Sequence, residues 1–278
     1  MKMDEETKIR NIIFIVIIVI CVLALSYGIY FQVFVKNRDV VSTPPPVVTE
    51  EIEFDELFDN KFHVQEGRPL PNVSKLDQTK DIVYTNYTLN EVYDGKYDIK
   101  ASIPMININH EKIINIDKEI TSIFYNKLNN ILENFKKEDA QNSIYSVSYS
   151  AFINENILSL VIKATLKEGN TPQRLIIKGY TYNLSTNEEI ALKDMLEIKN
   201  IDETLVETEI NRKVQESINY TNNMSSLGYD VYKRDINNTI YKVENVDNYI
   251  LGPNGSIYII YAYGNSNYTT ESDIVYIK

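Results

Sequence analysis

Few side chains in this sequence form a pattern that catalysis or metal binding requires. The chain of 278 residues has two histidines, His63 and His110, and one cysteine, Cys21. A zinc site needs three or four Cys, His or carboxylate ligands, and a cysteine nucleophile needs a nearby base. The histidines stand far apart and Cys21 lies in an apolar run, where it reads as a buried residue. No glycine-rich nucleotide loop and no Gly-x-Ser-x-Gly motif is present. We therefore predict no catalytic residue, no metal ligand and no cofactor.

Carboxylates are the remaining candidates for acid–base chemistry. The chain has 39 Asp and Glu against 28 Lys and Arg, a formal net charge of −11. Two facing carboxylates suffice for glycoside hydrolysis, but nothing in the sequence singles out a pair. Nucleic acid is disfavoured as a partner, because phosphate contacts need a basic surface. The negative charge instead favours the approach of a basic protein.

Tyrosine is the other abundant side chain with binding chemistry. The chain has 21 tyrosines and no tryptophan. Tyrosine offers a rigid amphipathic surface that suits a protein partner or a stacked sugar ring. The alternative, which we prefer, is that most are half-buried residues of a sheet. The pattern therefore assigns no particular ligand-binding residue.

Residues 11–35 contain no charged side chain. An apolar run of about 18 or more residues predicts a membrane-spanning helix. We predict a cytoplasmic tail over 1–10, a transmembrane helix over 11–35 and an extracellular remainder, because a tail of that length holds no domain. The remainder lacks cysteine, so its stability must come from core packing. A signal peptide cleaved near Ala24-Leu25-Ser26 is the alternative, although the apolar run continues beyond that site.

Residues 36–80 are predicted to be a Pro-rich, acidic tether. Three consecutive prolines over 44–46 favour an extended spacer. A dense acidic run over 50–59, interleaved with apolar residues, reads either as a docking segment for a cationic partner or, as we prefer, as a solvated, self-repelling tether. His63 falls in this segment and is expected on the surface, as is His110 at a helix start.

Residues 81–199 predict strands around one long helix. Strands are predicted where apolar residues alternate with polar ones, or where β-branched and aromatic side chains are frequent. The second strand should end at Pro104. Apolar residues three or four apart predict a helix that begins after a cap at Asn109 and runs to Phe135. The last three strands should form an antiparallel meander under this helix. The predicted strands are 82–89, 97–103, 145–153, 158–166 and 174–184.

Residues 200–278 are predicted to form a second, smaller unit. A helical turn over 192–196 precedes an amphipathic helix over 205–218, with Asp202 as its cap. Residues 219–245 are poorly periodic, and the chain closes with a hairpin over 248–263 and a short strand over 273–277. We predict an α+β fold, with antiparallel sheets each covered by an amphipathic helix, in two lobes (81–199 and 200–278) after one N-terminal transmembrane helix.

Four stretches after residue 80 share a strand-turn-helix pattern. They are IPMINI (103–108), the strand pair 145–153 and 157–166, YNLSTNEEIALKDML (182–196) and the final hairpin strand 256–263. Together these stretches resemble the paired extracytoplasmic domains called PdaC-type and RsiV-type, which occur in a membrane-bound peptidoglycan deacetylase and a lysozyme-sensing anti-sigma factor. Asn187 stands where the family often has a turn glycine, and asparagine also adopts left-handed backbone.

The resemblance implies a binding or sensing module. The deacetylase's catalytic domain and the anti-sigma factor's cytoplasmic domain have no counterpart in this sequence. We predict a single-pass, membrane-anchored, extracytoplasmic and non-catalytic module of a bacterial cell envelope, with lysozyme or peptidoglycan as ligand. The alternatives are a wall-active hydrolase with paired carboxylates and a purely structural envelope protein.

Overall fold

A computed structural model describes residues 53–136, 142–171, 173–229, 231–246, 248–264 and 272–278. Residues 52–278 form one compact unit. The predicted tail and transmembrane helix, 1–10 and 11–35, lie outside the described residues. Among those that are described, no helix is both long and apolar enough to cross a membrane.

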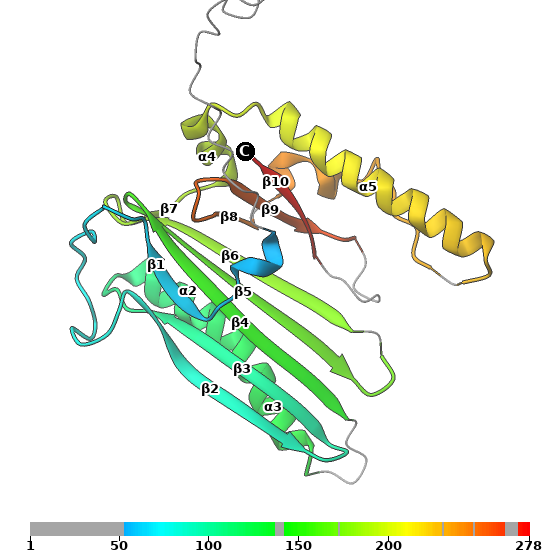
Figure 1. Ribbon diagram of the computed structural model, residues 1–278, viewed down its shortest axis with the longest axis horizontal. Coiled ribbons are helices and arrows are strands. Elements are labelled where there is room, and N and C mark those ends of the chain that lie inside the picture. The colour runs from blue at the N-terminus through cyan, green and yellow to red at the C-terminus, as the bar shows by residue number, and fades with distance from the viewer. Residues whose placement is uncertain (1–52, 137–141, 172, 230, 247, 265–271) are drawn as a thin grey trace, which may run out of the picture. The chain divides into compact units, whose positions relative to one another are not determined.

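Within the described residues seven strands form one larger sheet, in the order β2-β3-β4-β5-β6-β7 with β1 beside β4 (Figure 1). Neighbouring strands are antiparallel except at β3–β4 and β1–β4, which are parallel. The helix between β3 and β4 returns the chain across the sheet, so these two strands run in the same direction. The strands are β1 (Lys61–Val64), β2 (Val83–Tyr93), β3 (Tyr97–Ile106), β4 (Ser143–Asn154), β5 (Ile157–Glu168), β6 (Arg174–Asn183) and β7 (Glu188–Glu189).

A continuous helix covers one face of the larger sheet (Figure 1). It consists of α2 (Glu111–Ile120), a π-helical turn η3 (Thr121–Tyr125) and α3 (Asn126–Asn134). The apolar residues on its inner face, among them Ile113, Phe124 and Leu128, are fully buried against the inward side chains of β3, β4 and β5. The predicted long helix and the antiparallel β4-β5-β6 meander are therefore confirmed.

The described residues also form a smaller, antiparallel sheet in the order β10-β9-β8, packed under helix α5. Asp202 caps α5 as predicted, because its side chain accepts a hydrogen bond from the Thr204 backbone N–H at 2.8 Å. Helix α4, placed in the first lobe by the sequence, contributes Leu192, Met195 and Leu196 to this second core. The elements are α4 (Leu192–Lys199), α5 (Glu203–Ser226), η4 (Thr239–Tyr241), η5 (Val243–Asn245), β8 (Asn248–Leu251), β9 (Ile257–Ala262) and β10 (Ser272–Ile277).

The two sheets pack face to face through a third apolar cluster, which includes Val161 and Ile177 of the larger sheet and Ile250 of the smaller one. Polar side chains join the sheets at the same place. The Asn248 amide accepts from the Gly179 backbone N–H (2.7 Å) and donates to the Ile177 carbonyl (3.0 Å). This side chain satisfies backbone groups at the outer edge of β6, as a neighbouring strand would.

Of three local predictions, two differ from the structure and one agrees with it. Strand β3 continues through Pro104 to Ile106, because the strand next to it bulges where the proline N–H is missing. The N-cap of α2 is His110 rather than Asn109. Asn187 does adopt left-handed backbone, with φ of 58°, as the sequence suggested.

Part of the predicted tether is ordered structure. A 3₁₀ turn, η2 (Phe54–Leu57), places Leu57 in the cluster between the sheets, and β1 adds a parallel strand beside β4. Leu57 is buried here, and Phe54 and Phe58 pack partly buried against the same cluster, whose other residues lie far later in the sequence, from Phe152 onwards. The solvated-tether prediction is therefore wrong for residues 54–64.

Candidate ligand-binding pocket

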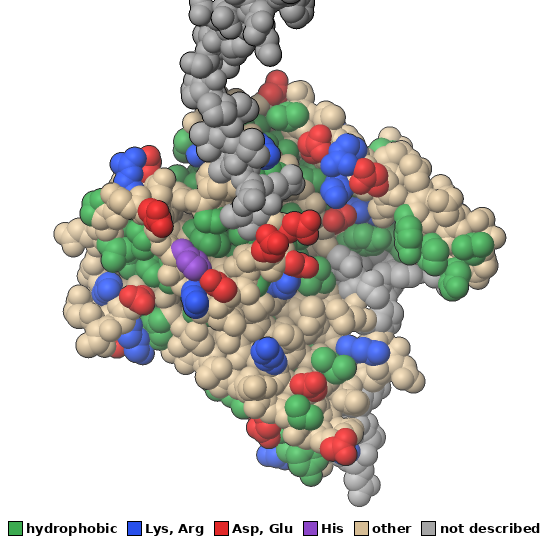
Figure 2. Space-filling model, viewed as in Figure 1, with side chains coloured by type: hydrophobic (Ala, Val, Ile, Leu, Met, Phe, Trp, Pro, Cys, Tyr) green, Lys and Arg blue, Asp and Glu red, His purple; other side chains and the backbone are tan. Residues whose placement is uncertain are grey.

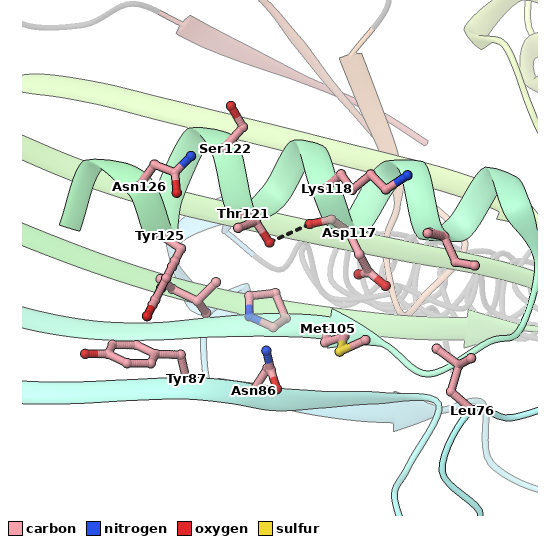
Figure 3. A pocket seen from close by; sticks show the side chains of 13 residues that line it. Leu76, Asn86, Tyr87, Met105, Asp117, Lys118, Thr121, Ser122, Tyr125 and Asn126 are labelled. Carbon is pink, nitrogen blue, oxygen red and sulfur yellow. Dashed lines mark hydrogen bonds between the residues drawn. The ribbon is translucent and has the colours of Figure 1, made fainter. Parts of the chain in front are cut away.

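A pocket of about 660 Å³ lies between the α2-η3-α3 helix and strands β2 and β3 (Figure 3). We call it the bulge pocket. Cavities of about 300–1,000 Å³ are typical of small-molecule sites. The lining residues are Leu76, Asn86, Tyr87, Ile103, Pro104, Met105, Ile114, Asp117, Lys118, Thr121, Ser122, Tyr125 and Asn126.

Two backbone irregularities face each other across the bulge pocket. In β2 the pairing with β3 shifts between Thr85 and Tyr87, so Asn86 is an extra residue opposite the Pro104 region. In the helix, Thr121–Tyr125 forms a π turn, which inserts one residue and widens the helix. Bulges of both kinds re-aim side chains and are frequent at functional sites. Here they direct Asn86 and Tyr125 towards one space (Figure 3), which Asn126 also lines.

Asp117 is the one carboxylate among the lining residues. Its Oδ1 accepts a hydrogen bond from the Ile106 backbone N–H at 2.9 Å, whereas its buried Oδ2 has no partner. Burial raises the pKa of Asp117 to about 6, although the Ile106 N–H opposes this shift. The neighbouring Lys118 points away from the strands, and its Nζ donates to Asn115 Oδ1 at 3.3 Å (Figure 3).

The rest of the lining combines aromatic rings with uncommitted polar groups. Tyr87 and Tyr125 meet edge to face, with centroids 4.9 Å apart and planes at 74°. Burial, reinforced by Tyr125 and Glu91, raises the pKa of Tyr87, so its phenol stays a neutral donor at pH 7. Within the described residues the side chains of Asn86, Ser122 and Asn126 make no hydrogen bond that would occupy them. Apolar rings beside free amides and hydroxyls suit a small ligand with both apolar and polar faces.

A second hollow lies between α2, the β6–β7 edge and η5. Its volume is about 1040 Å³, and its charged residues are partly paired across it. Lys112 pairs with Glu188, and Lys178 with Glu119 at 3.3 Å. Because these ion pairs tie α2 to the sheet edge, we interpret the hollow as a structural seam.

The residues that the sequence suggested for chemistry are not brought together. His63 lies in β1, stacks on Phe152 and pairs with Asp59 Oδ2 at 2.8 Å. His110 Nδ1 hydrogen-bonds the Tyr182 hydroxyl at 2.9 Å. In the described part of the chain, no group of three or more Cys, His, Asp or Glu side chains could hold a metal ion. Among the described residues that line the bulge pocket, Asp117 is the one carboxylate, whereas the hydrolase alternative requires a facing pair.

Asp117 was missed by sequence reasoning, although a signal for it exists. It lies four residues after Ile113 and three before Ile120, on the buried face of the helix. A carboxylate at a position where the period predicts an apolar residue is a candidate functional group. The facing bulges leave no comparable signal, because each arises from pairing with distant residues.

We expect Asp117→Asn to make stability less dependent on pH. The folded carboxyl, with its pKa of about 6, holds its proton more tightly than the unfolded one near 3.8. The wild type therefore gains stability as pH falls from 7 towards 4 and loses it as pH rises through 6. A shift of this size, discounted for partial exposure, amounts to about 1–2 kcal/mol.

Urea unfolding at pH 4 and pH 8 measures this effect. The stability of Asp117→Asn relative to wild type should be about 1–2 kcal/mol more favourable at pH 8 than at pH 4. Asp98→Asn, an exposed site on β3, is the matched control and should show no such difference. Parallel pH profiles for wild type and Asp117→Asn would contradict the assigned burial.

No protein-family model and no curated protein matches the chain. Solved structures that it resembles include a DUF3298 family protein from Pseudomonas aeruginosa PAO1, 11% identical, with a TM-score of 0.36 over 76% of this chain and 91% of that chain. A member of the same family from Bacteroides fragilis is 13% identical, with a TM-score of 0.32 over 66% and 80%. The resemblance to PdaC-type and RsiV-type domains stays a prediction.

Proposed function

We propose that this protein is a membrane-anchored, extracytoplasmic module that binds a cell-envelope glycan in the bulge pocket. The observation that carries the proposal is the pair of facing bulges, which opens a cavity lined by two tyrosines, free amide and hydroxyl groups and one carboxylate. Pyranose rings present an apolar face and a rim of hydroxyls, and this lining offers partners for both. Peptidoglycan is the ligand of this class that an envelope protein meets.

The anchoring part of the proposal rests on the sequence. The charge-free run over 11–35 is long enough to span a bilayer, and we place the folded part on its outer side as part of the proposal. A binding module held there would meet wall glycan directly.

A lysozyme-like protein is the second candidate ligand. It is favoured by the net charge of −11, which attracts a basic partner. Such binding should weaken strongly between low and physiological salt, because exposed charges are screened over about 8–10 Å at physiological ionic strength. Binding of a neutral glycan in a pocket should change little over the same range.

The test is a titration of the full-length chain, in mild detergent, with soluble disaccharide fragments of peptidoglycan and with lysozyme. Asn86→Leu should fill the space between β2 and the helix, towards which Asn86 points (Figure 3), and reduce glycan affinity at least tenfold without a change in fold. Tyr220→Ala, an exposed tyrosine on α5, is the control and should bind as the wild type does. Glycan binding that Asn86→Leu leaves unchanged would place the ligand elsewhere, and absence of glycan binding would reject the proposal.

A further inference from the structure

The Asp117 carboxylate is the least satisfied group in the bulge pocket. One of its oxygens is held by a backbone N–H, and the other is buried without a donor. An ionised carboxylate in this position lacks both a counter-charge and a hydrogen bond. A ligand hydroxyl would supply the hydrogen bond alone, whereas a ligand ammonium group would supply both.

No protein cation in the described residues takes that role. Lys118, the cation that lines the pocket, points away from the strands and bonds Asn115 (Figure 3). The other titratable groups that face this region are the phenols of Tyr87 and Tyr125 in the pocket and of Tyr180 beneath the helix. Burial raises the pKa of Tyr87 and of Tyr180, so these two phenols stay neutral and the carboxylate sets the local charge.

We propose that the bulge pocket selects a ligand that carries a primary ammonium group, bound against Asp117. This inference rests on the proposed function and narrows its ligand to hydroxylated amines. An amino sugar with a free amine has this chemistry: its ring suits Tyr87 and Tyr125, its hydroxyls suit Asn86 and Asn126, and its ammonium suits the carboxylate. The N-acetylated form of the same sugar keeps the ring and hydroxyls but loses the charge.

The matched ligand pair provides the experiment. The full-length chain is titrated with the β-1,4-linked glucosamine disaccharide and with its N-acetylated counterpart. We expect the free amine to bind at least tenfold more tightly to wild type. In Asp117→Asn this preference should disappear. Asp98→Asn removes the same charge from exposed β3, so it controls for the general attraction of a cation to an acidic protein.

The outcomes separate the inference from the proposed function. Equal affinity for the two disaccharides, or tighter binding of the acetylated one, overturns the inference and leaves the glycan pocket standing. A preference that survives in Asp117→Asn overturns the role of this carboxylate. Binding of neither disaccharide, together with no binding of peptidoglycan fragments, overturns both. Loss of the preference in Asp117→Asn but not in Asp98→Asn supports the assignment.

Discussion

Replacing Arg234 with methionine is expected to lower the free energy of unfolding by about 2–4 kcal/mol, because Arg234 is fully buried whereas its partner Asp273 is 31% exposed. The Arg234 side chain is fully buried, and its Nη1 pairs with Asp273 Oδ2 of β10 at 2.8 Å. Its Nε donates to the Tyr241 hydroxyl at 3.1 Å, and the guanidinium carbon lies 4.4 Å from the Tyr263 ring centroid. Methionine keeps the length of the side chain but leaves Asp273 without its cation.

The size of this effect follows from what Arg234 joins. It ties the irregular segment after α5 to the edge of the smaller sheet, through a charge pair and the faces of Tyr241, Tyr261 and Tyr263. Removing one partner of a buried ion pair lowers stability more than removing both partners does. Arg234→Lys should not restore stability, since a lysine cannot reproduce the planar contacts with the rings and the acid.

Urea unfolding of Arg234→Met, Asp273→Asn and the double variant measures the coupling. The double variant should be more stable than the sum of the two single losses predicts, because the orphaned carboxylate is gone. Arg212→Met, on the exposed face of α5, is the control and should cost less than about 1 kcal/mol. If Arg234→Met lowers the free energy of unfolding by less than about 1 kcal/mol, the contacts of Arg234 with Asp273 and the tyrosines contribute little to stability.

Arg234 also shows which part of the fold the sequence could not predict. It lies in the stretch 219–245, which has no period, and its partners are up to 39 residues away. The long helix and the β4-β5-β6 meander were predictable, because each repeats an apolar pattern over ten or more residues. The parallel pairing of β3 with β4 was not, since strand direction depends on the path of the connecting helix.

The bulge pocket was likewise beyond the sequence pattern, apart from Asp117. The apolar stripe of the helix continues across Thr121–Tyr125, because both Ile123 and Phe124 are apolar and either register fits. The sequence therefore conceals the extra residue of the π turn. The shift at Asn86 depends on pairing with β3 and leaves an ordinary strand pattern in the sequence.

Gly179 of β6 offers a second test with a large expected effect, at the contact between the two sheets. A Cβ placed on Gly179 would lie 2.7 Å from the Tyr249 carbonyl oxygen and 2.8 Å from Ile250 Cγ2. The first of these atoms is backbone, so it cannot rotate away. Gly179→Ala must therefore push β8 from β6, which weakens the Asn248 hydrogen bonds and opens the apolar cluster between the sheets.

We expect Gly179→Ala to lower the free energy of unfolding by about 2–3 kcal/mol, as overpacking of a tight interface does. Lys178→Ala, next to it on the opposite face of β6, should cost under about 1 kcal/mol because it loses only a surface ion pair.

Hydrogen exchange of Gly179→Ala shows whether the two sheets unfold together. Equal loss of protection in β4 and β9 means that both sheets unfold as one cooperative unit, whereas loss confined to β8–β10 means that the larger sheet and its helix form a lobe that is stable without them. The extent of the apolar cluster, which takes residues from both sheets, favours the first result, and an unchanged stability would contradict the close contact itself.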